Sequence, residues 1–326
     1  MKISASLPTG VAGLFFDGAR RRRRLEERLV RRLEEDGFSE VILPVIDYLD
    51  PYEEMLSAGS REELYRLIDR DGAVLVLRAD FTPMLARLIA PRLGSLPKPL
   101  KLFYRGDVLR YREERAGRPR ELYQLGAEIL GAGGGAGERL ALRQLLAVLD
   151  ACGGGAIVVL GFAGALDQLI LACAGRASPL EVMQALVRRE RSVARRCHRA
   201  LLEVVERGVP ADPSALGEGA AAELARLEAL RDELAVAFPR LELKIDLAEF
   251  ADQARQETLY RQLGGRAYYD GLVFRAFGRA SARPLGGGGR YDRLFEKLEA
   301  ETTAAGFCID LDALVELAGE RGEEGS

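Results

Sequence analysis

The sequence predicts an α+β protein in which a mostly antiparallel sheet is flanked by helices. Two long strand candidates, residues 101–111 and 121–130, are joined by the polar segment REERAGRPR, a pattern typical of an antiparallel hairpin. Between later strand candidates, residues 179–238 are rich in Leu, Ala, Arg and Glu at helical spacing. A helical stretch within a series of strands indicates a small helical subdomain inserted into the sheet domain.

The composition is that of an ordinary globular protein. The chain has 326 residues, 48% hydrophobic and 30% charged, so it can bury a large core. Its formal net charge of -3 gives no general reason to expect a nucleic-acid partner. The four cysteines form no CxxC pair, which favours neither disulfides nor a zinc site. No signal peptide or membrane span is recognisable, so we expect a cytoplasmic protein.

A strong amphipathic helix is predicted near the N-terminus. Asp17 is suited to cap its start and Gly37 to end it. Leucines at four-residue intervals from Leu25 to Leu33 form an apolar stripe that would face the core. The arginine run at residues 20–24 suggests a nucleic-acid contact. Acidic residues follow on the same helix, however, so we interpret the run as part of a solvated face.

The remaining elements continue the same pattern. Short strands are expected at 40–43 and 73–77. After the hairpin we expect, in order, a glycine-rich connection at 131–137, a helix over 138–149, strands at 156–162, 241–245 and 267–277, a turn at 286–289, a helix from Arg290 and a strand at 305–309. The only histidine, His198, is interpreted as a solvated helix position.

These elements predict three parts of the chain. Residues 1–178 and 239–320 would form the core domain, residues 179–238 the inserted helical subdomain, and residues 321–326 a frayed tail.

Polar residues are concentrated on one face of the strand ELYQLGAEIL. Because side chains of a strand alternate between its faces, Gln124, Gly126 and Glu128 share one face, while the other is apolar. The glycine leaves room between an amide and a carboxylate, and Arg110 on the preceding strand adds a cation. The alternative is a solvent-exposed sheet face, and this strand alone favours neither interpretation.

Three further motifs carry candidate binding residues. In LRADFTP, Asp80 and Thr82 follow a strand and precede a helix, where they would either bind a ligand or cap the helix. In RAYYDGLVF, Tyr268 and Tyr269 stand beside a glycine. In LGGGGRYD, the glycines before Tyr291 resemble a phosphate loop only weakly, because the GK[ST] ending is missing.

The order and spacing of these motifs resemble histidyl-tRNA synthetases of class II over residues 7–317. The resemblance is carried by LPTGVAGLFF, LRADFTP, YRGDVLRYREERAGRPRELYQLGAEILG, YYDGLVF, GGGGRYD and GFCIDLDAL. It implies a class II aminoacyl-tRNA synthetase-like antiparallel sheet flanked by helices.

The same resemblance implies a histidine-binding site. It assigns the amino group of the ligand to Asp80, Thr82 and Gln124, the imidazole to Glu128 and Tyr269, and the pocket wall to Tyr268 and Tyr291. Arg110 matches the class II arginine that contacts the α-phosphate and the ligand carboxylate. The chemistry agrees, since a zwitterion with an imidazole needs carboxylates, a cation and an acceptor for the ring N–H.

Several departures from the family concern ATP. Where synthetases have an arginine in an RGLDYY pattern, this chain has Gly264, followed two residues later by Arg266. The third class II motif normally ends with an arginine for the γ-phosphate. Here Asp310, Asp312 and Ala313 occupy that region, and the carboxylates would repel a triphosphate.

Two other motifs are altered. Arg112 replaces a glutamate of the second motif, and the glutamate expected before Thr82 is shortened to Asp80. The sequence ends shortly after the third motif, so no anticodon-binding domain is expected.

A chain that keeps the histidine pocket but lacks these ATP and tRNA elements resembles the regulatory subunit of ATP phosphoribosyltransferase. That resemblance implies a non-catalytic chain, needed for activity of the short catalytic subunit and for feedback inhibition by L-histidine in the first step of histidine biosynthesis. It further implies a homodimer, formed through residues 17–44, within a hetero-octamer. We expect no catalytic residues, metal, cofactor, tRNA or membrane contact.

Two enzymatic alternatives stay open. One is a shortened histidyl-tRNA synthetase-like enzyme that activates an amino acid with ATP. The other is a paralogue that ligates an amino acid to another macromolecule. Both would need the arginine that binds ATP.

Overall fold

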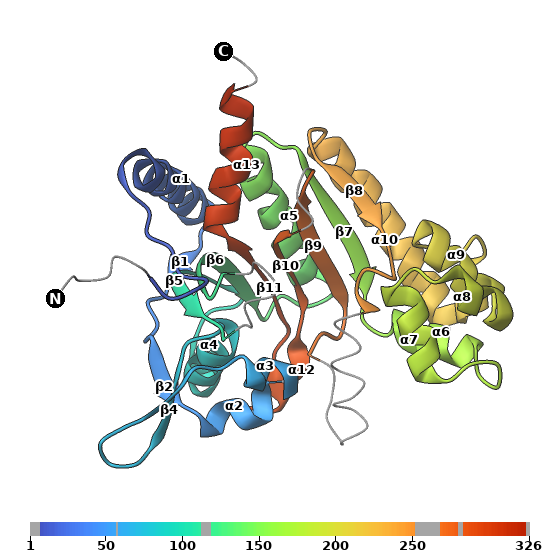
Figure 1. Cartoon of the computed structure of the whole chain (residues 1–326), viewed down its shortest axis with the longest axis horizontal. Helices are drawn as coiled ribbons and strands as arrows, with labels where there is room; N and C mark the ends of the chain where they lie inside the picture. The colour runs from blue at the N-terminus through green and yellow to red at the C-terminus, as the bar shows by residue number, and fades with distance from the viewer. Residues whose placement is uncertain (1–6, 57, 112–118, 252–267, 280–282, 324–326) are drawn as a thin grey trace. The chain divides into compact units, whose positions relative to one another are not determined.

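The computed structural model describes residues 7–56, 58–111, 119–251, 268–279 and 283–323 (Figure 1). The chain folds into two compact units. Unit 1 comprises residues 1–128, 294–301 and 308–326, and unit 2 comprises residues 129–293 and 302–307. Among the described residues, no helix is both long and apolar enough to cross a membrane.

Unit 1 begins with the long helix α1 (Phe16–Glu35). The predicted leucine stripe is confirmed, because Leu25, Leu29 and Leu33 are all at most 2% exposed. The helix ends as predicted before Gly37, whose φ of 80° suits a glycine and whose N–H donates to the Glu34 carbonyl. The N-cap prediction was wrong: the helix starts at Phe16, so Asp17 lies inside the first turn.

The strands of unit 1 form two sets. In the first, β1 (Ser39–Glu40) pairs in parallel with β5 (Leu100–Leu109), and β5 neighbours β6 (Glu121–Leu130). Near the hairpin connection the Arg110 N–H donates to the Arg120 carbonyl. Residues 112–118, which include most of the predicted turn, lie outside the described residues.

The second set is a small antiparallel sheet in the order β2-β4-β3, made of β2 (Ile46–Tyr48), β4 (Val74–Leu77) and β3 (Arg66–Ile68). Only its central strand was predicted. The described residues of unit 1 also form α2 (Asp50–Met55), α3 (Ala58–Glu62), α4 (Thr82–Ile89), the 3-10 helix η1 (Ala90–Ser95) and α13 (Leu311–Glu323). The short helix α12 (Asp292–Glu296) begins in unit 2 and ends in unit 1.

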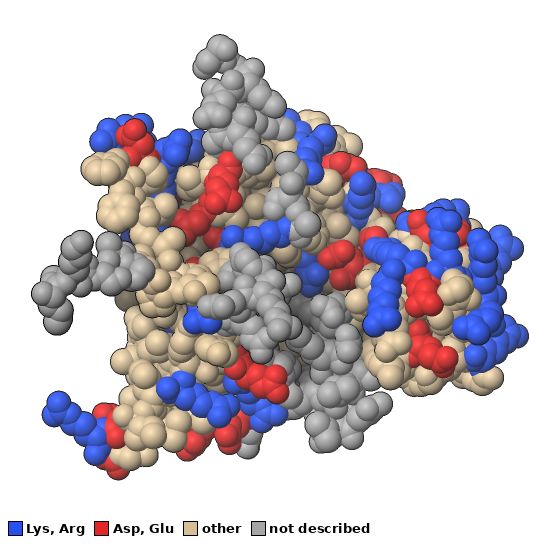
Figure 2. Space-filling view, viewed as in Figure 1, with Lys and Arg blue, Asp and Glu red and all other residues tan. Residues whose placement is uncertain are grey.

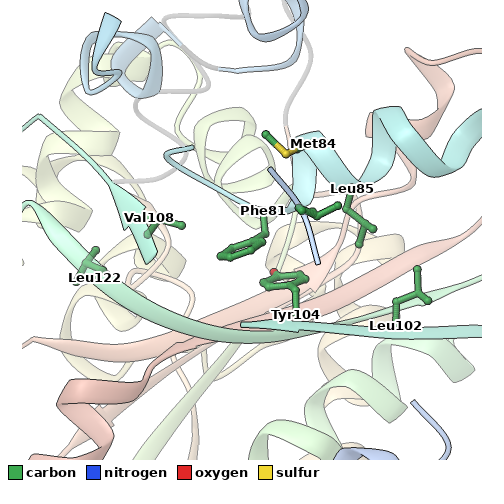
Figure 3. Packing of buried hydrophobic residues seen from close by; sticks show 8 residues of the cluster. Phe81, Met84, Leu85, Leu102, Tyr104, Val108 and Leu122 are labelled. Atoms are coloured by element: carbon green, nitrogen blue, oxygen red, sulfur yellow. The ribbon is translucent and has the colours of Figure 1, made fainter. Parts of the chain in front are cut away.

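A hydrophobic cluster lies between α4 and the strands β5 and β6 of unit 1 (Figure 3). The rings of Phe81 and Tyr104 stack at its centre with their centroids 4.3 Å apart. Figure 3 shows Met84 and Leu85 of α4 beside this ring pair, with Leu102 along β5. This packing fixes the start of α4 against the strands that carry the candidate site.

Among the described residues of unit 2, the strands β10, β9, β7 and β8 neighbour one another in this order. They are β7 (Ala156–Phe162), β8 (Glu242–Ile245), β9 (Leu272–Gly278) and β10 (Pro284–Arg290). β9 is antiparallel to both β7 and β10, whereas β7 and β8 are parallel. The sheet is therefore mixed. The first four residues of β11 (Ala304–Asp310) also belong to this unit.

The described residues of unit 2 also form helices. They are α5 (Ala136–Ala151), α6 (Ala165–Ala172), α7 (Pro179–Val187), α8 (Arg191–Cys197), α9 (Arg199–Arg207), the 3-10 helix η3 (Pro213–Leu216) and α10 (Glu218–Ala237). α6 contacts α7, α9 and η3, so the helical part begins before the expected boundary at residue 179. The division into a core and an inserted subdomain stays a prediction.

Several charged side chains of the helical part pair with one another. Figure 2 shows basic side chains gathered over α8 and α9, with acidic side chains between them. Arg199 and Arg207 both lie within 4 Å of Glu203, and Arg191 pairs with Glu206. Local pairing of this kind is typical of a solvated helical surface.

Two local predictions were wrong in unit 2. His198 is not inside a helix: it lies between α8 and α9, and its Nδ1 accepts the Ala200 N–H at 3.1 Å as an N-cap. The glycine run at 286–289 is not a turn but the middle of β10, and the following helix starts at Asp292. A Cβ on Gly288 would lie 2.0 Å from the Gly306 carbonyl oxygen, so this backbone contact requires glycine.

Candidate functional site

The centre of the candidate site in unit 1 is the Glu128 carboxylate, which is only 1% exposed. Its Oε1 accepts hydrogen bonds from the Thr82 hydroxyl at 2.8 Å and from the Tyr104 hydroxyl at 3.1 Å. A buried carboxylate is costly unless it is hydrogen-bonded, and these two donors come from α4 and β5. Glu128 is therefore held in one position by groups from two other elements.

Tyr104 reaches Glu128 because Gly126 has no side chain. A Cβ on Gly126 would lie 2.5 Å from the hydroxyl oxygen of Tyr104. Burial raises the pKa of Tyr104 well above its ordinary value, and the charge of Glu128 raises it further, so the phenol remains a hydrogen-bond donor. The space predicted beside the glycine exists, but a tyrosine fills it. The alternative of a solvent-exposed sheet face is wrong.

Asp80 and Arg110 form the more accessible part of this cluster. One oxygen of Asp80 accepts the Thr82 N–H at 2.9 Å, so Asp80 does help to start α4. Its other oxygen lies 3.5 Å from Nη2 of Arg110, whose Nε donates to the Ala79 carbonyl. The Asp80 side chain is 39% exposed, so it stays partly accessible while it caps the helix and pairs with Arg110.

Gln124 is buried with one polar atom unused. It is 6% exposed, and among the described residues its Oε1 has no hydrogen-bond partner. A buried acceptor without a donor costs about 1–3 kcal/mol. An N–H group of a ligand at this point would remove that cost.

Two residues of this cluster were missed by the sequence analysis. Tyr104 lies in the first strand of the predicted hairpin, but its contact with Gly126 depends on the register between the two strands. Cys308 of β11 faces the same charged groups: burial raises the pKa of its thiol to about 12, and Asp80 raises it further while Arg110 lowers it. The sequence singled out GFCIDLDAL only for its acidic residues.

Arg78 of LRADFTP is a structural residue. It is 4% exposed, and its guanidinium donates to the carbonyls of Leu43, Pro44 and Asp107. It also lies 3.9 Å from the ring centroid of Phe81. Arg78 therefore joins three chain segments below the site rather than binding a ligand.

The three predicted tyrosines gather in unit 2. The rings of Tyr268 and Tyr269 meet edge to face with centroids 4.8 Å apart, and Tyr268 stacks on Tyr291 at 5.6 Å. A Cβ on Gly289 would lie 2.8 Å from the ring of Tyr269, so this glycine makes room for the aromatic group. The tyrosines form one aromatic cluster beside β10, in which Tyr291 is buried.

The arginine of GGGGRYD is held by carboxylates. Arg290 donates to Asp292 at 2.6 and 2.8 Å and to Glu138 at 3.3 Å, and it lies 3.6 Å from Asp270. Burial raises the pKa of Asp270. Arg226 also donates to Glu138. Arg290 is thus neutralised within unit 2, and the motif is not a phosphate loop.

The acidic residues of the third motif have local roles in unit 1. Asp310 precedes α13 and accepts the N–H groups of Asp312 and Ala313, so it caps this helix. Asp312 lies 3.4 Å from the guanidinium of Arg22 in α1. Gly264, Arg266 and Arg112, which were compared with synthetase positions, lie outside the described residues.

The two clusters differ in the chemical groups that they contain. The cluster in unit 1 contains acceptors for N–H groups and the guanidinium of Arg110, and the cluster in unit 2 consists of aromatic rings. Among the residues that the structure describes, no group of three or more His, Cys, Asp or Glu is suited to hold a metal ion. The fold and the motif residues together define a histidyl-type class II aminoacyl-tRNA synthetase domain.

Comparison with known proteins narrows this class. The histidyl-tRNA synthetase family matches residues 10–314. The ATP phosphoribosyltransferase regulatory subunit of Moorella thermoacetica is 34% identical over 96% of this chain and 82% of its own length. The protein of the same description from Anaeromyxobacter sp. (strain Fw109-5) is 32% identical over 95% of this chain and 92% of its own length.

A solved structure shows the same fold. It comes from Bacillus halodurans, is described as an ATP phosphoribosyltransferase regulatory subunit/histidyl-tRNA synthetase, and matches with a TM-score of 0.79 at 23% identity, covering 98% of this chain and 84% of its own. The chain belongs to the family of ATP phosphoribosyltransferase regulatory subunits, which share the histidyl-tRNA synthetase-like domain. A regulatory subunit is consistent with a non-catalytic role.

Proposed function

We propose that this chain is required by a short ATP phosphoribosyltransferase catalytic subunit and makes that enzyme sensitive to L-histidine. The observation that carries the proposal is the buried Glu128, held by two hydroxyl groups in a cluster that also contains the unsatisfied acceptor of Gln124. A preorganised carboxylate with a nearby unused acceptor favours a ligand rich in N–H groups.

Each group of histidine has a proposed partner. Asp80, Thr82 and Gln124 would bind the ammonium group, and Arg110 the carboxylate. Glu128 would accept from the imidazole, and Tyr269 would contribute to its recognition, while Tyr268 and Tyr291 would line the pocket. The partly exposed carboxylate of Asp80 and the unused Oε1 of Gln124 support the first of these assignments.

The proposal excludes amino-acid activation. Asp310 and Asp312 place two carboxyl groups at the start of α13, where the synthetase family is expected to bind the γ-phosphate of ATP. The partner would supply all catalytic groups. We further propose that two copies pair through the α1 region and assemble with catalytic subunits into a hetero-octamer. We place this assembly in the cytoplasm, a location consistent with four free cysteines.

Two measurements test this function. Calorimetry would measure histidine binding to the purified chain, and an assay of the reconstituted complex would measure phosphoribosyl transfer with and without histidine. Glu128→Gln keeps the size of the side chain but removes its charge. We expect it to weaken histidine binding and inhibition about tenfold or more, the loss of one charged hydrogen bond.

The matched control is Glu121→Gln at the exposed end of the same strand, which should behave as wild type. A catalytic subunit that is fully active and histidine-sensitive without this chain would contradict the proposal. So would pyrophosphate exchange by the chain alone with histidine and ATP, which would instead support the amino-acid-activating alternative.

A further inference from the structure

One side chain of α1 joins the two strands that carry the candidate site in unit 1. Glu26 is 5% exposed, and its Oε1 accepts from Nη1 of Arg105 at 2.5 Å and from the Tyr123 hydroxyl at 2.6 Å. Arg105 belongs to β5 and Tyr123 to β6. Arg105 also donates to Glu40 at 2.8 Å. A buried carboxylate with two charged or polar donors is a strong, directional contact.

This contact lies directly behind the candidate histidine site. Successive side chains of a strand point to opposite faces, so Arg105 and Tyr123 face α1 while their neighbours Tyr104 and Gln124 face the site. Tyr104 in turn donates to Glu128. A displacement of either strand caused by a ligand would therefore move the partners of Glu26 as well.

A second contact holds Tyr123 to the same helix. The guanidinium of Arg22 lies 4.6 Å from the ring centroid of Tyr123, and it also pairs with Asp312 at the start of α13. Arg22 and Glu26 are one helical turn apart. Burial, followed by the hydrogen bond to Glu26, raises the pKa of Tyr123 to about 12, so the phenol keeps its proton at physiological pH.

We propose that Glu26 and Tyr123 are positioning residues that couple α1 to the histidine site. The inference rests on the proposed function, because it needs histidine to bind and to inhibit the complex. A helix that shifts with the strands can pass the binding event to another chain packed on it, and the same coupling must act in reverse. Neither residue needs to touch histidine.

The test compares Tyr123→Phe and Glu26→Gln with the control Glu27→Gln, which changes the exposed neighbouring residue of α1. Histidine affinity is measured on the chain alone by calorimetry, and histidine inhibition on the complex with the catalytic subunit. We expect the inhibition constant of the complex to rise about fivefold for both variants, within the usual range of coupling energies. Affinity of the chain alone should change by less than about twofold.

The outcomes separate the two proposals. Unchanged inhibition in Tyr123→Phe and Glu26→Gln, with normal histidine binding by wild type, overturns the coupling. An equal loss of binding and inhibition also overturns it, because that pattern indicates local damage to the site. If wild type binds no histidine, the proposed function fails first and the coupling with it. Should Glu26→Gln not fold, Tyr123→Phe, which removes one oxygen atom, decides the test.

Discussion

Thr82 donates its hydroxyl hydrogen to Oε1 of Glu128 across 2.8 Å, although 46 residues separate them in the chain. Thr82 is the first residue of α4, and Glu128 lies on β6. Because both side chains are buried, the bond ties the start of the helix to the strand and fixes the position of the carboxylate.

Replacing Thr82 tests this bond. Thr82→Val keeps the shape of the side chain but removes the donor, so Glu128 keeps the hydroxyl of Tyr104 and loses that of Thr82. We expect histidine affinity to fall about tenfold and the free energy of unfolding to fall by about 1–3 kcal/mol. Thr82→Ser retains the hydroxyl and should keep most of the affinity. Equal affinities of the Val and Ser variants in calorimetry would show that the hydroxyl has no part in binding.

Gly126→Ala tests the place of Tyr104. The new methyl group would lie about 2.5 Å from the ring, so Tyr104 must move and its bond to Glu128 must weaken. We expect a loss of about 1–3 kcal/mol in unfolding free energy from overpacking, and weaker histidine binding. Gly94→Ala is the control within unit 1, because nothing lies within 4 Å of its Cβ position. Chemical denaturation measures the stability of both variants. Equal stabilities would contradict the interpretation that Gly126 makes room for Tyr104.

Gly288→Ala tests the strand assignment of the glycine run. Its Cβ would meet the Gly306 carbonyl oxygen at 2.0 Å, a backbone atom that cannot turn away. We expect a loss of about 3 kcal/mol or more, measured by urea unfolding. The control Gly133→Ala has no atom within 4 Å. A tolerant Gly288→Ala variant would argue for the turn that the sequence suggested.

The sequence predicted those helices and strands whose apolar residues form a clear local pattern. The leucine stripe of α1 and strand β7 were predicted because each repeats an apolar pattern or forms a continuous apolar run. The three-residue strands β2 and β3 gave no such signal, because their side chains are mostly exposed. Their pairing depends on β4, which only the fold brings beside them.

The sequence analysis named candidate site residues but did not predict which of them contact one another. Asp80, Thr82 and Glu128 were named from motif order, and the structure brings Thr82 and Glu128 together. Tyr104 and Cys308 were missed because their roles depend on which residues face them across strands. The turn predicted for the glycines of β10 was wrong for the same reason. A glycine in a turn and a glycine in close contact with a neighbouring strand cannot be told apart from one sequence.

The last prediction concerns acid stability of the helical part of unit 2. Glu203 of α9 accepts the Ala211 N–H at 2.7 Å and the guanidinium of Arg199 at 2.8 Å. The hydrogen bond from Ala211, followed by that from Arg199, lowers the pKa of Glu203 below its ordinary value of 4.5. A lowered pKa means that the folded protein favours the charged form. The contribution is therefore present above pH 4.5 and is lost as the pH falls through the lowered value.

Glu203→Gln removes the charge and with it this pH dependence. We expect the variant to be about 1 kcal/mol less stable than wild type at pH 7, because a charged hydrogen bond becomes a neutral one. The difference should shrink as the pH falls below 4.5, where the wild-type carboxylate gains a proton. Urea unfolding followed by circular dichroism between pH 7 and about pH 3.5 measures the stability of the variant and of wild type as a function of pH.

Glu27→Gln on the exposed face of α1 serves as the charge control. The opposite result is a difference in unfolding free energy between Glu203→Gln and wild type that stays constant over this pH range. That result would mean that the charge of Glu203 does not stabilise its contact with Ala211.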